Sequence, residues 1–258
     1  MEMATANVVL QIGTDRLEAN MSVPTAPISI ADLMPIARGI MAKVLQVAEE
    51  RVVEEGKTVS CQKGCGACCR QLVPISETEA RMIVDLVEQM PEPRRTEIRD
   101  RFQRAKEKME ATGYWDRLRD RAEWSPEDVQ KIGVEYFHLG IPCPFLEEES
   151  CSIHLDRPLT CREYLVTSPA ENCARPQAHT IDQVPISLKV WPAIAKFDAV
   201  AKGQRFLRWV PLSMVLDWAA EAPVPPSPRP GPELLKEFFE HLTGKPIPGQ
   251  PVAPSVTG

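Results

Sequence analysis

The chain has 258 residues and a formal net charge of -6, with 43% hydrophobic and 26% charged residues. This length can bury a hydrophobic core without cysteine cross-links, and the composition is that of a folded rather than a disordered protein. The acidic balance argues against a nucleic-acid surface, which would show a basic excess, and no apolar run approaches the roughly 18 residues of a membrane span.

The first segment is expected to form β structure. Weak alternation of apolar and polar residues around NVVLQIG and LEANMSV predicts a small hairpin over residues 7–23. The start of the sequence lacks the positive charge and the apolar core of a secretory signal, so we expect a cytoplasmic protein. In that reducing compartment cysteines stay as free thiols, which favours metal binding or catalysis over disulfides.

Two helices are expected on either side of a cysteine-rich loop. Apolar side chains recur at helical spacing over residues 32–55, and Gly56 is a plausible end for that helix. After the loop, Ser76 and Glu79 have the spacing of a capping box. Apolar residues at 80, 83, 84 and 87 then predict one buried face, so a second helix begins here.

The middle of the chain predicts two further helices and a hairpin. Residues 93–124 are rich in Arg and Glu around a sparse apolar line, which indicates a solvated amphipathic helix with ion pairs. Ser125 followed by Pro126 is typical of a helix start, and that helix should reach about residue 139. The stretch CPFLEEESCSIH predicts a hairpin with its polar turn at residues 147–150.

The remaining segments complete a mainly α fold with minor β structure. VPISLKVW predicts a short strand and PLSMVLDWAA a helix. We expect an irregular cysteine-rich metal-binding core surrounded by helices, divided into four parts. These are a β segment over residues 1–28, a helical domain over 29–220 that encloses the cysteine region 61–173, a proline-rich linker over 221–232, and a terminal helix with a mobile tail over 233–258.

Four of the eight cysteines fall within nine residues, with the spacing C-x3-C-x2-C-C: Cys61, Cys65, Cys68 and Cys69. Glycines at 64 and 66 allow a tight turn that can direct amide N–H groups at sulfur. Crowded thiols would repel one another once ionised, whereas a bound cation would deprotonate them outright. Side chains of adjacent residues in an extended segment point in opposite directions, so either Cys68 or Cys69 is packed or catalytic, or the two face different metal atoms.

The other four cysteines are widely spaced along the chain: Cys143, Cys151, Cys161 and Cys173. Their gaps match no standard zinc-finger or ferredoxin pattern. Each lies in a loop-like sequence rather than on a helical apolar stripe, which argues against simple core filling. We therefore expect both groups to converge on one metal centre.

Several polar residues near the cysteines are candidates to support that centre. A four-thiolate site around Zn²⁺ or a [4Fe–4S] cluster carries a charge near -2, which burial requires the protein to offset. Arg157 and Arg162 are the candidates for this cofactor-binding role, and Lys63 and Arg70 are further candidates; the alternative is that all four are ordinary surface residues. His154 is a candidate extra ligand, the alternative being a half-buried histidine at the end of a strand, and His138 and His179 have weaker claims.

The motifs CQKGCGACC, PCPFL and CSIHLDRPLTCREY, followed by a final cysteine, resemble the bacterial CxxCxxCC cysteine-cluster family, described as zinc- or iron-chelating proteins. The resemblance covers Cys61 to Cys173 and implies that all eight cysteines occupy the cluster positions of the family. One feature departs from the family label, because three residues rather than two separate Cys61 from Cys65.

Two classes of function follow. The first is a cytosolic metal-binding protein with a redox or metal-handling role, which holds an iron–sulfur cluster by preference or zinc as the alternative. The second is an enzyme, since the family includes proteins similar to flagellin lysine N-methylases; S-adenosylmethionine and a protein substrate would then be implied. C-x3-C-x2-C is also the radical-SAM spacing, but that fold needs repeated strand–helix units that the sequence does not show. A thiol oxidoreductase using Cys68 and Cys69 lacks the usual C-x-x-C dithiol.

Overall fold

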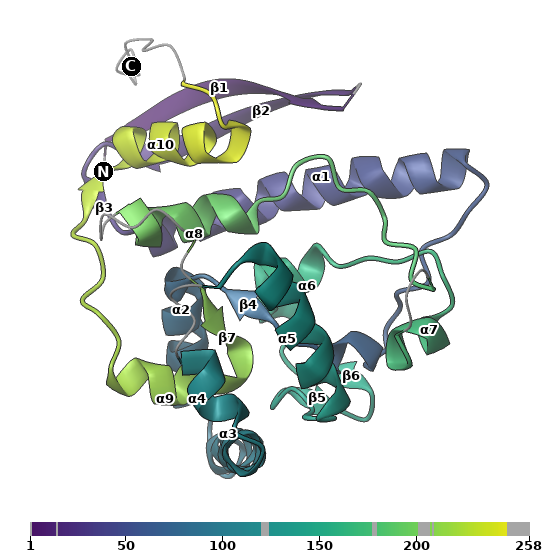
Figure 1. Ribbon diagram of the computed structural model, residues 1–258. Helices are drawn as coiled ribbons and strands as arrows, with labels where there is room; N and C mark the ends of the chain where they lie inside the picture. The colour runs from purple at the N-terminus through teal and green to yellow at the C-terminus, as the bar shows by residue number, and fades with distance from the viewer. Residues whose placement is uncertain are drawn as a thin grey trace.

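The computed structural model describes residues 2–13, 15–119, 124–176, 180–200, 207 and 209–246. Helices dominate, and the strands of these residues form four two-stranded sheets, so the expected mainly α fold with minor β structure is confirmed. In the view of Figure 1 a long hairpin lies at the top, the C-terminal helix and then two further helices lie below it, and the remaining helices form the lower half. The expected mobile tail falls largely on residues 247–258, outside the described part.

The N-terminal hairpin is confirmed and is longer than its sequence pattern indicates. Strands β1 (Met3–Ile12) and β2 (Asp15–Pro24) pair in antiparallel register from Met3 opposite Pro24 to Ile12 opposite Asp15. One face buries Leu10, Ile12 and Val23, as expected for side chains that alternate across a strand. That face packs against the C-terminal helix α10 (Gly231–Thr243), which lies beside the hairpin in Figure 1.

A long helix carries the chain from the hairpin to the cysteine loop. After the 3-10 turn η1 (Ile30–Leu33), helix α1 (Met34–Glu54) confirms the helix expected over residues 32–55. Gly56 follows with a φ of 71°, a left-handed conformation that suits glycine. The buried stripe of α1 joins one core with side chains of the hairpin, of α10 and of a helix at 191–200.

That last helix, α8 (Trp191–Val200), was not expected from the sequence, and the strand expected just before it is wrong. Residues 184–191 find no partner strand. The backbone N–H groups of Val190 and Trp191 instead donate to Oε1 of Glu163, at 2.5 and 3.2 Å. A carboxylate at this place satisfies the first amides of a helix and favours its positive end, so the segment leads into α8.

The lower half is built around a second core. Helix α2 (Glu77–Glu88) begins at the expected capping box, in which Ser76 Oγ accepts from the Glu79 amide and the Glu79 carboxylate accepts from Ser76. The single helix expected over residues 93–124 is instead two, α3 (Arg94–Ala111) and α4 (Tyr114–Arg119). Gly113 lies between them with a φ of 72°, which turns the chain.

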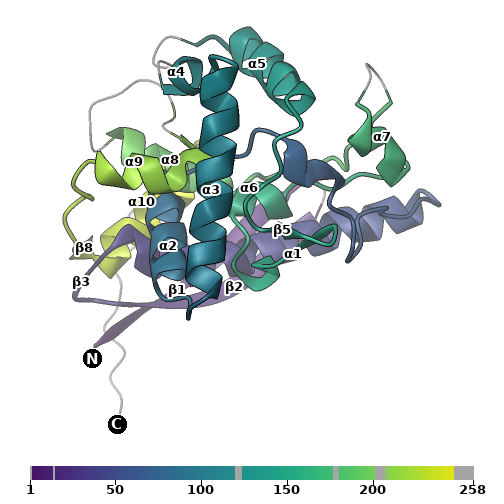
Figure 2. The ribbon, with the colours of Figure 1, turned by 90° about the horizontal axis from the view of Figure 1, so that it is seen from below.

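Two further helices of the lower half match expectation. Helix α5 (Pro126–His138) is capped by Ser125, and the turn η4 (Leu212–Met214) continues into α9 (Val215–Ala220). Two short pairings tie distant segments: β3 (Pro27–Ile28) with β8 (Arg229–Pro230), and β4 (Pro74–Ile75) with β7 (Val210–Pro211). Figure 2 shows α3 as the outermost of these helices, in front of α2.

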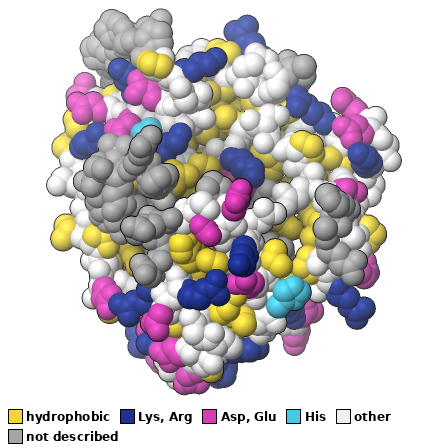
Figure 3. Space-filling model, viewed as in Figure 1, with side chains coloured by type: hydrophobic (Ala, Val, Ile, Leu, Met, Phe, Trp, Pro, Cys, Tyr) yellow, Lys and Arg dark blue, Asp and Glu magenta, His cyan; other side chains and the backbone are white. Residues whose placement is uncertain are grey.

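No helix of the described residues combines the length and apolar character needed to cross a bilayer. On the face drawn in Figure 3, Lys and Arg side chains lie interspersed with Asp and Glu rather than gathered into a single basic patch. That face therefore lacks the electrostatic footprint that nucleic-acid binding usually requires.

Candidate metal centre

The first cysteine group occupies a loop and one short turn. Cys61 and Cys65 lie in the loop after α1, and Cys68 and Cys69 lie in the 3-10 turn η2 (Ala67–Arg70). Gly64 has a φ of 91°, which confirms that the loop needs glycine for its turn. Cys69 N–H donates to Gly66 O at 3.0 Å, so the turn holds the two adjacent cysteines in a fixed relation.

The second group is carried by a loop and three short elements. Cys143 precedes the hairpin of β5 (Leu146–Glu147) and β6 (Ser150–Cys151), and Cys151 ends that hairpin. The hairpin is confirmed, with residues 148 and 149 at positive φ in its turn. Cys161 lies in α6 (Leu159–Arg162) and Cys173 in α7 (Ala170–Ala174).

The structure brings the hairpin against the first cysteine group. The Cys143 N–H donates to Cys69 O at 2.7 Å. Arg70 donates to both carboxylate oxygens of Glu149, at 3.0 and 2.6 Å, and to Gly66 O at 3.0 Å. A Cβ at Gly66 would lie 2.6 Å from Leu146 Cδ1 and 3.0 Å from Glu149 Cα. The hairpin can therefore approach η2 this closely only because residue 66 is glycine.

Helix α7 approaches the same turn from another side. Ser60 N–H donates to Val166 O at 2.8 Å, and Ser60 Oγ donates to Thr167 O at 3.1 Å. These bonds join the start of the cysteine loop to the segment that leads into α7. Helix α7 itself contacts η2. Figures 1 and 2 both show α7 on one side of this turn and the β5–β6 hairpin on the other. The two distant cysteine segments therefore meet around η2.

All eight cysteines are free thiols in a partly or fully buried setting. Burial is the largest cause that raises the pKa of five of them, with Cys143 at about 12: Cys61, Cys143, Cys151, Cys161 and Cys173. These thiols are neutral at pH 7 without a cation, whereas a bound metal would hold them as thiolates.

Cys68 lies at the centre of the group. The Cys69 thiol donates a hydrogen bond to the Cys68 sulfur, which lowers the pKa of Cys68 to about 7 and raises that of Cys69. The charge of Cys68 also contributes to the raised pKa of the five buried thiols named above, so its sulfur is close to both cysteine segments.

The two arginines expected near the centre have different places. Arg157 lowers the pKa of Cys61, Cys68 and Cys151, so its guanidinium lies among thiols of both segments. Its buried Nε has no hydrogen-bond partner among the described residues. Arg162 Nε donates to Arg157 O at 2.9 Å, so Arg162 supports the turn that carries Arg157.

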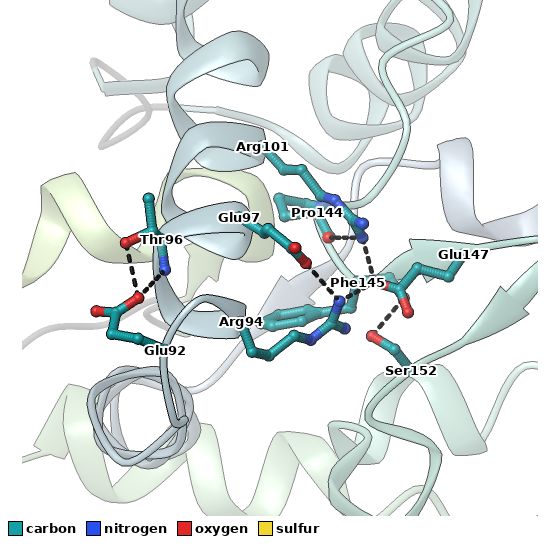
Figure 4. Close-up of polar contacts among 9 residues, drawn as sticks. All are labelled: Glu92, Arg94, Thr96, Glu97, Arg101, Pro144, Phe145, Glu147 and Ser152. Atoms are coloured by element: carbon teal, nitrogen blue, oxygen red, sulfur yellow. Dashed lines mark hydrogen bonds and ion pairs between the residues drawn. The ribbon is translucent and has the colours of Figure 1, made fainter.

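An anchor on α3 holds the hairpin, and the sequence did not predict it. Arg94 and Arg101 both donate to Oε1 of Glu147, the latter at 2.5 Å, and Arg101 also donates to Pro144 O at 3.3 Å. Figure 4 shows the two arginines reaching from one face of α3 towards Glu147. The available signal was their spacing of seven residues, which places both on one side of a helix.

The remaining polar candidates have weaker claims. Lys63, His138 and His154 are exposed, and Arg157 is the largest cause that lowers the pKa of His154. His241 belongs to α10 and packs on Phe197. His179 lies outside the described residues.

The donors fit a thiophilic metal in kind, because free, mostly neutral thiols surround one turn with a cation beside them. In the part of the chain that the structure describes, no three or more His, Cys, Asp or Glu side chains are already grouped as a metal-ion shell. Metal binding would therefore draw the thiols closer than they stand.

Comparison with known proteins gives one match. Residues 60–180 match the family model CxxCxxCC, described as a "Putative zinc- or iron-chelating domain". The resemblance seen in the cysteine motifs is thereby confirmed, and it extends over the region that the two cysteine segments occupy. No curated protein and no solved structure matches the chain.

Proposed function

We propose that the chain is a cytosolic protein that binds zinc or iron through thiolates from both cysteine segments. The observation that carries the proposal is the contact between the segments, in which Cys143 N–H bonds to Cys69 O at 2.7 Å. A family match to a metal-chelating domain over the same residues supports metal binding in general. The free state of all eight cysteines fits a reducing compartment.

An iron–sulfur cluster is the metal group we favour. Backbone N–H groups of Phe145 and Ile153 bond to the sulfur atoms of Cys143 and Cys151 and lower their pKa, against the larger effect of burial. Such bonds tune the reduction potential of iron–sulfur clusters, which supports a redox role. Zinc is the alternative, and it would contribute its binding energy to folding without redox chemistry.

The described fold does not favour the enzymatic alternative. All four strand pairs among these residues are antiparallel and two-stranded. Cofactor-binding folds made of repeated strand–helix units have parallel sheets instead. We therefore place electron transfer or metal handling ahead of S-adenosylmethionine-dependent methyl transfer.

The test is metal analysis and an absorption spectrum of full-length protein purified without air. We expect stoichiometric iron and sulfide with broad absorption near ~400 nm, as thiolate-bound iron–sulfur clusters give. Colourless protein with stoichiometric zinc would replace the cluster by the zinc alternative. Protein that contains no metal and binds neither zinc nor iron afterwards would overturn the proposal.

A further inference from the structure

The adjacent cysteines of η2 separate two sets of thiols. The turn lies between α7 on one side and the β5–β6 hairpin on the other (Figures 1 and 2). Cys68 and Cys69 are adjacent in this turn, which Cys69 N–H closes by its bond to Gly66 O, and Cys69 O accepts from Cys143 N–H. The thiols around the turn can therefore be assigned by the element that each one shares a core with.

The first set lies on the side of α7. Cys173 is buried in a small cluster with Ala67 and Val166, and Cys61 and Cys65 pack against the same cluster. Ser60 ties this loop to the segment that leads to α7 through its bonds to residues 166 and 167.

The second set lies on the side of the hairpin. Cys143 and Cys151 pack against a different core, which includes Phe145 and Ile153. Cys69 joins this side through its carbonyl bond to Cys143 N–H. Cys161 is held there because Thr160 Oγ1 donates to Pro74 O at 2.6 Å, and α6 contacts β4.

We infer that the eight cysteines form two four-thiolate metal sites rather than one centre. Site one consists of Cys61, Cys65, Cys68 and Cys173. Site two consists of Cys69, Cys143, Cys151 and Cys161. The inference rests on the proposed function and adds to it the number of sites and the ligands of each.

The chemistry of the donors supports this division. Four thiolates complete the tetrahedral shell of one zinc ion, and four also hold one [4Fe–4S] cluster, so eight exceed what a single ion or cluster takes. Cys68 completes site one, because η2 contacts α7 while Cys69 is bonded to Cys143 of site two. Arg157 lies beside Cys61 and Cys68 of site one and Cys151 of site two, where one cation offsets charge from both.

The first experiment uses the unaltered full-length protein. Metal is removed under reducing, oxygen-free conditions, Zn²⁺ is added stepwise, and exposed thiols are alkylated briefly before intact-mass and peptide analysis. We expect species with four protected thiols at low zinc and eight at saturation, with two zinc ions bound. Each group of four protected cysteines should be one of the two sets, because a metal protects only its own ligands from alkylation.

Other patterns would overturn the inference and separate it from the proposed function. Protection that passes from none to eight thiols without a four-thiol species would indicate one polynuclear centre rather than two separate sites. Saturation at one zinc per chain, or four protected cysteines that come from both sets, would also contradict the two-site assignment, although metal binding itself would stand. Absence of any protection defeats both.

A pair of variants checks the result independently. Cys173→Ser and Cys161→Ser each remove one ligand from a different set, so each should lower zinc from two ions to one per chain. The set left intact should stay protected in each variant. Loss of both ions from either single variant would indicate one shared centre, and the wild-type titration decides the matter should a variant not fold.

Discussion

At the residue scale, the two glycines of the cysteine loop serve different purposes. Gly64 has a positive φ that other residues adopt with strain. Gly66 has an ordinary φ of -95°, so its backbone would accept a side chain. The β5–β6 hairpin excludes a side chain at this position, because Leu146 and Glu149 lie against the place that a Cβ would take. The sequence predicted a need for glycine here, but it did not distinguish a turn from a close approach.

Gly66→Ala should push the β5–β6 hairpin away from η2. The nearest backbone atom, Glu149 Cα, would lie 3.0 Å from the new methyl group and cannot move without the hairpin. We expect a loss of about 1–3 kcal/mol in the free energy of unfolding, as for overpacked cores, with weaker zinc binding. Urea unfolding and zinc titration measure both. Gly39→Ala, on α1 with open space around it, should be neutral or stabilising by about 0.5–1 kcal/mol; equal effects of the two changes would contradict the steric explanation.

Arg157→Gln should weaken metal binding without unfolding the chain. The guanidinium lowers the pKa of three thiols, so its removal leaves the thiolates of a loaded site less well compensated. We expect about 10-fold weaker zinc affinity, a typical cost of losing an outer-shell partner, measured by competition with a chromogenic chelator. Arg157→Lys should recover part of the loss. Unchanged affinity in the Gln variant would mean that Arg157 has no electrostatic role.

At the scale of elements, the ordinary-looking charged helix α3 positions the second cysteine segment. Its buried line of Ile98, Phe102, Ala105 and Met109 was expected from the sequence, since it follows local periodicity. Its contact with Glu147 was not, because it joins residues 46 and 53 positions apart. The ring of Phe102 also packs edge-on against Phe145, with centroids 5.6 Å apart.

Glu147→Gln should loosen the hairpin from α3. The substitution removes the charge that Arg94 and Arg101 share while keeping similar size (Figure 4). We expect a loss of about 1.5–3 kcal/mol in the free energy of unfolding, the range for hydrogen bonds to charged groups, and faster alkylation of Cys151 in metal-free protein. Glu97→Gln is the matched control, since Glu97 pairs with Arg94 only at 3.6 Å and is more exposed. A control variant as unstable as Glu147→Gln would contradict a specific anchor.

The start of α2 predicts a pH dependence of stability. Asp198 on α8 accepts hydrogen bonds from the N–H groups of Glu77 and Thr78, at 2.9 and 3.4 Å. Burial, followed by the charge of Glu77, raises the pKa of Asp198 to about 6, although these bonds and Arg81 act to lower it. An unfolded Asp has a pKa of about 3.9. Between roughly pH 4 and 6 the folded chain therefore keeps a proton that the unfolded chain has released, so this contribution to stability falls as pH rises.

Asp198→Asn should remove that contribution, because an amide does not titrate while its oxygen still accepts from Glu77 N–H. The free energy of unfolding in urea should therefore fall by about 2 kcal/mol more in the wild type than in the variant between pH 4.5 and pH 6.5. Asp116→Asn, on the exposed side of α4, should keep the wild-type dependence. Parallel pH profiles of wild type and Asp198→Asn would show that this carboxylate does not titrate as described.

At the scale of the whole molecule, the sequence predicted what is set locally and missed what depends on contacts between distant segments. Capped, periodic helices such as α2 and α5 were found because their signals lie within a few residues. Helix α8 was missed because Ala193, Ile194, Ala195 and Phe197 are all buried, so its apolar residues fall on several faces and show no helical period. The cysteine spacing predicted a shared centre, but its division by η2 follows only from the packing of α7 and the hairpin on opposite sides.

The C-terminal helix bears on whether the chain behaves as one body. The sequence places a proline-rich linker before α10, which allows a separate unit. In the structure α10 packs against α8 and β2, and Phe238, fully buried, shares a core with α1. Helix α8 in turn contacts α2 of the lower half. We propose that the two halves unfold together.

Phe238→Ala tests this coupling. The cavity should cost about 3–5 kcal/mol, a large part of the stability of an ordinary domain. Because α10 and the cysteine region are linked through α8 and α2, circular dichroism and alkylation of the cysteines in metal-free protein should report the same lowered urea midpoint. Lys236→Ala, at an exposed position of the same helix, should leave the midpoint within about 0.5 kcal/mol of the wild type. If the cysteines keep their wild-type midpoint while the helical signal falls at lower urea, α10 and the N-terminal β1–β2 hairpin form a unit that unfolds apart from the metal-binding region.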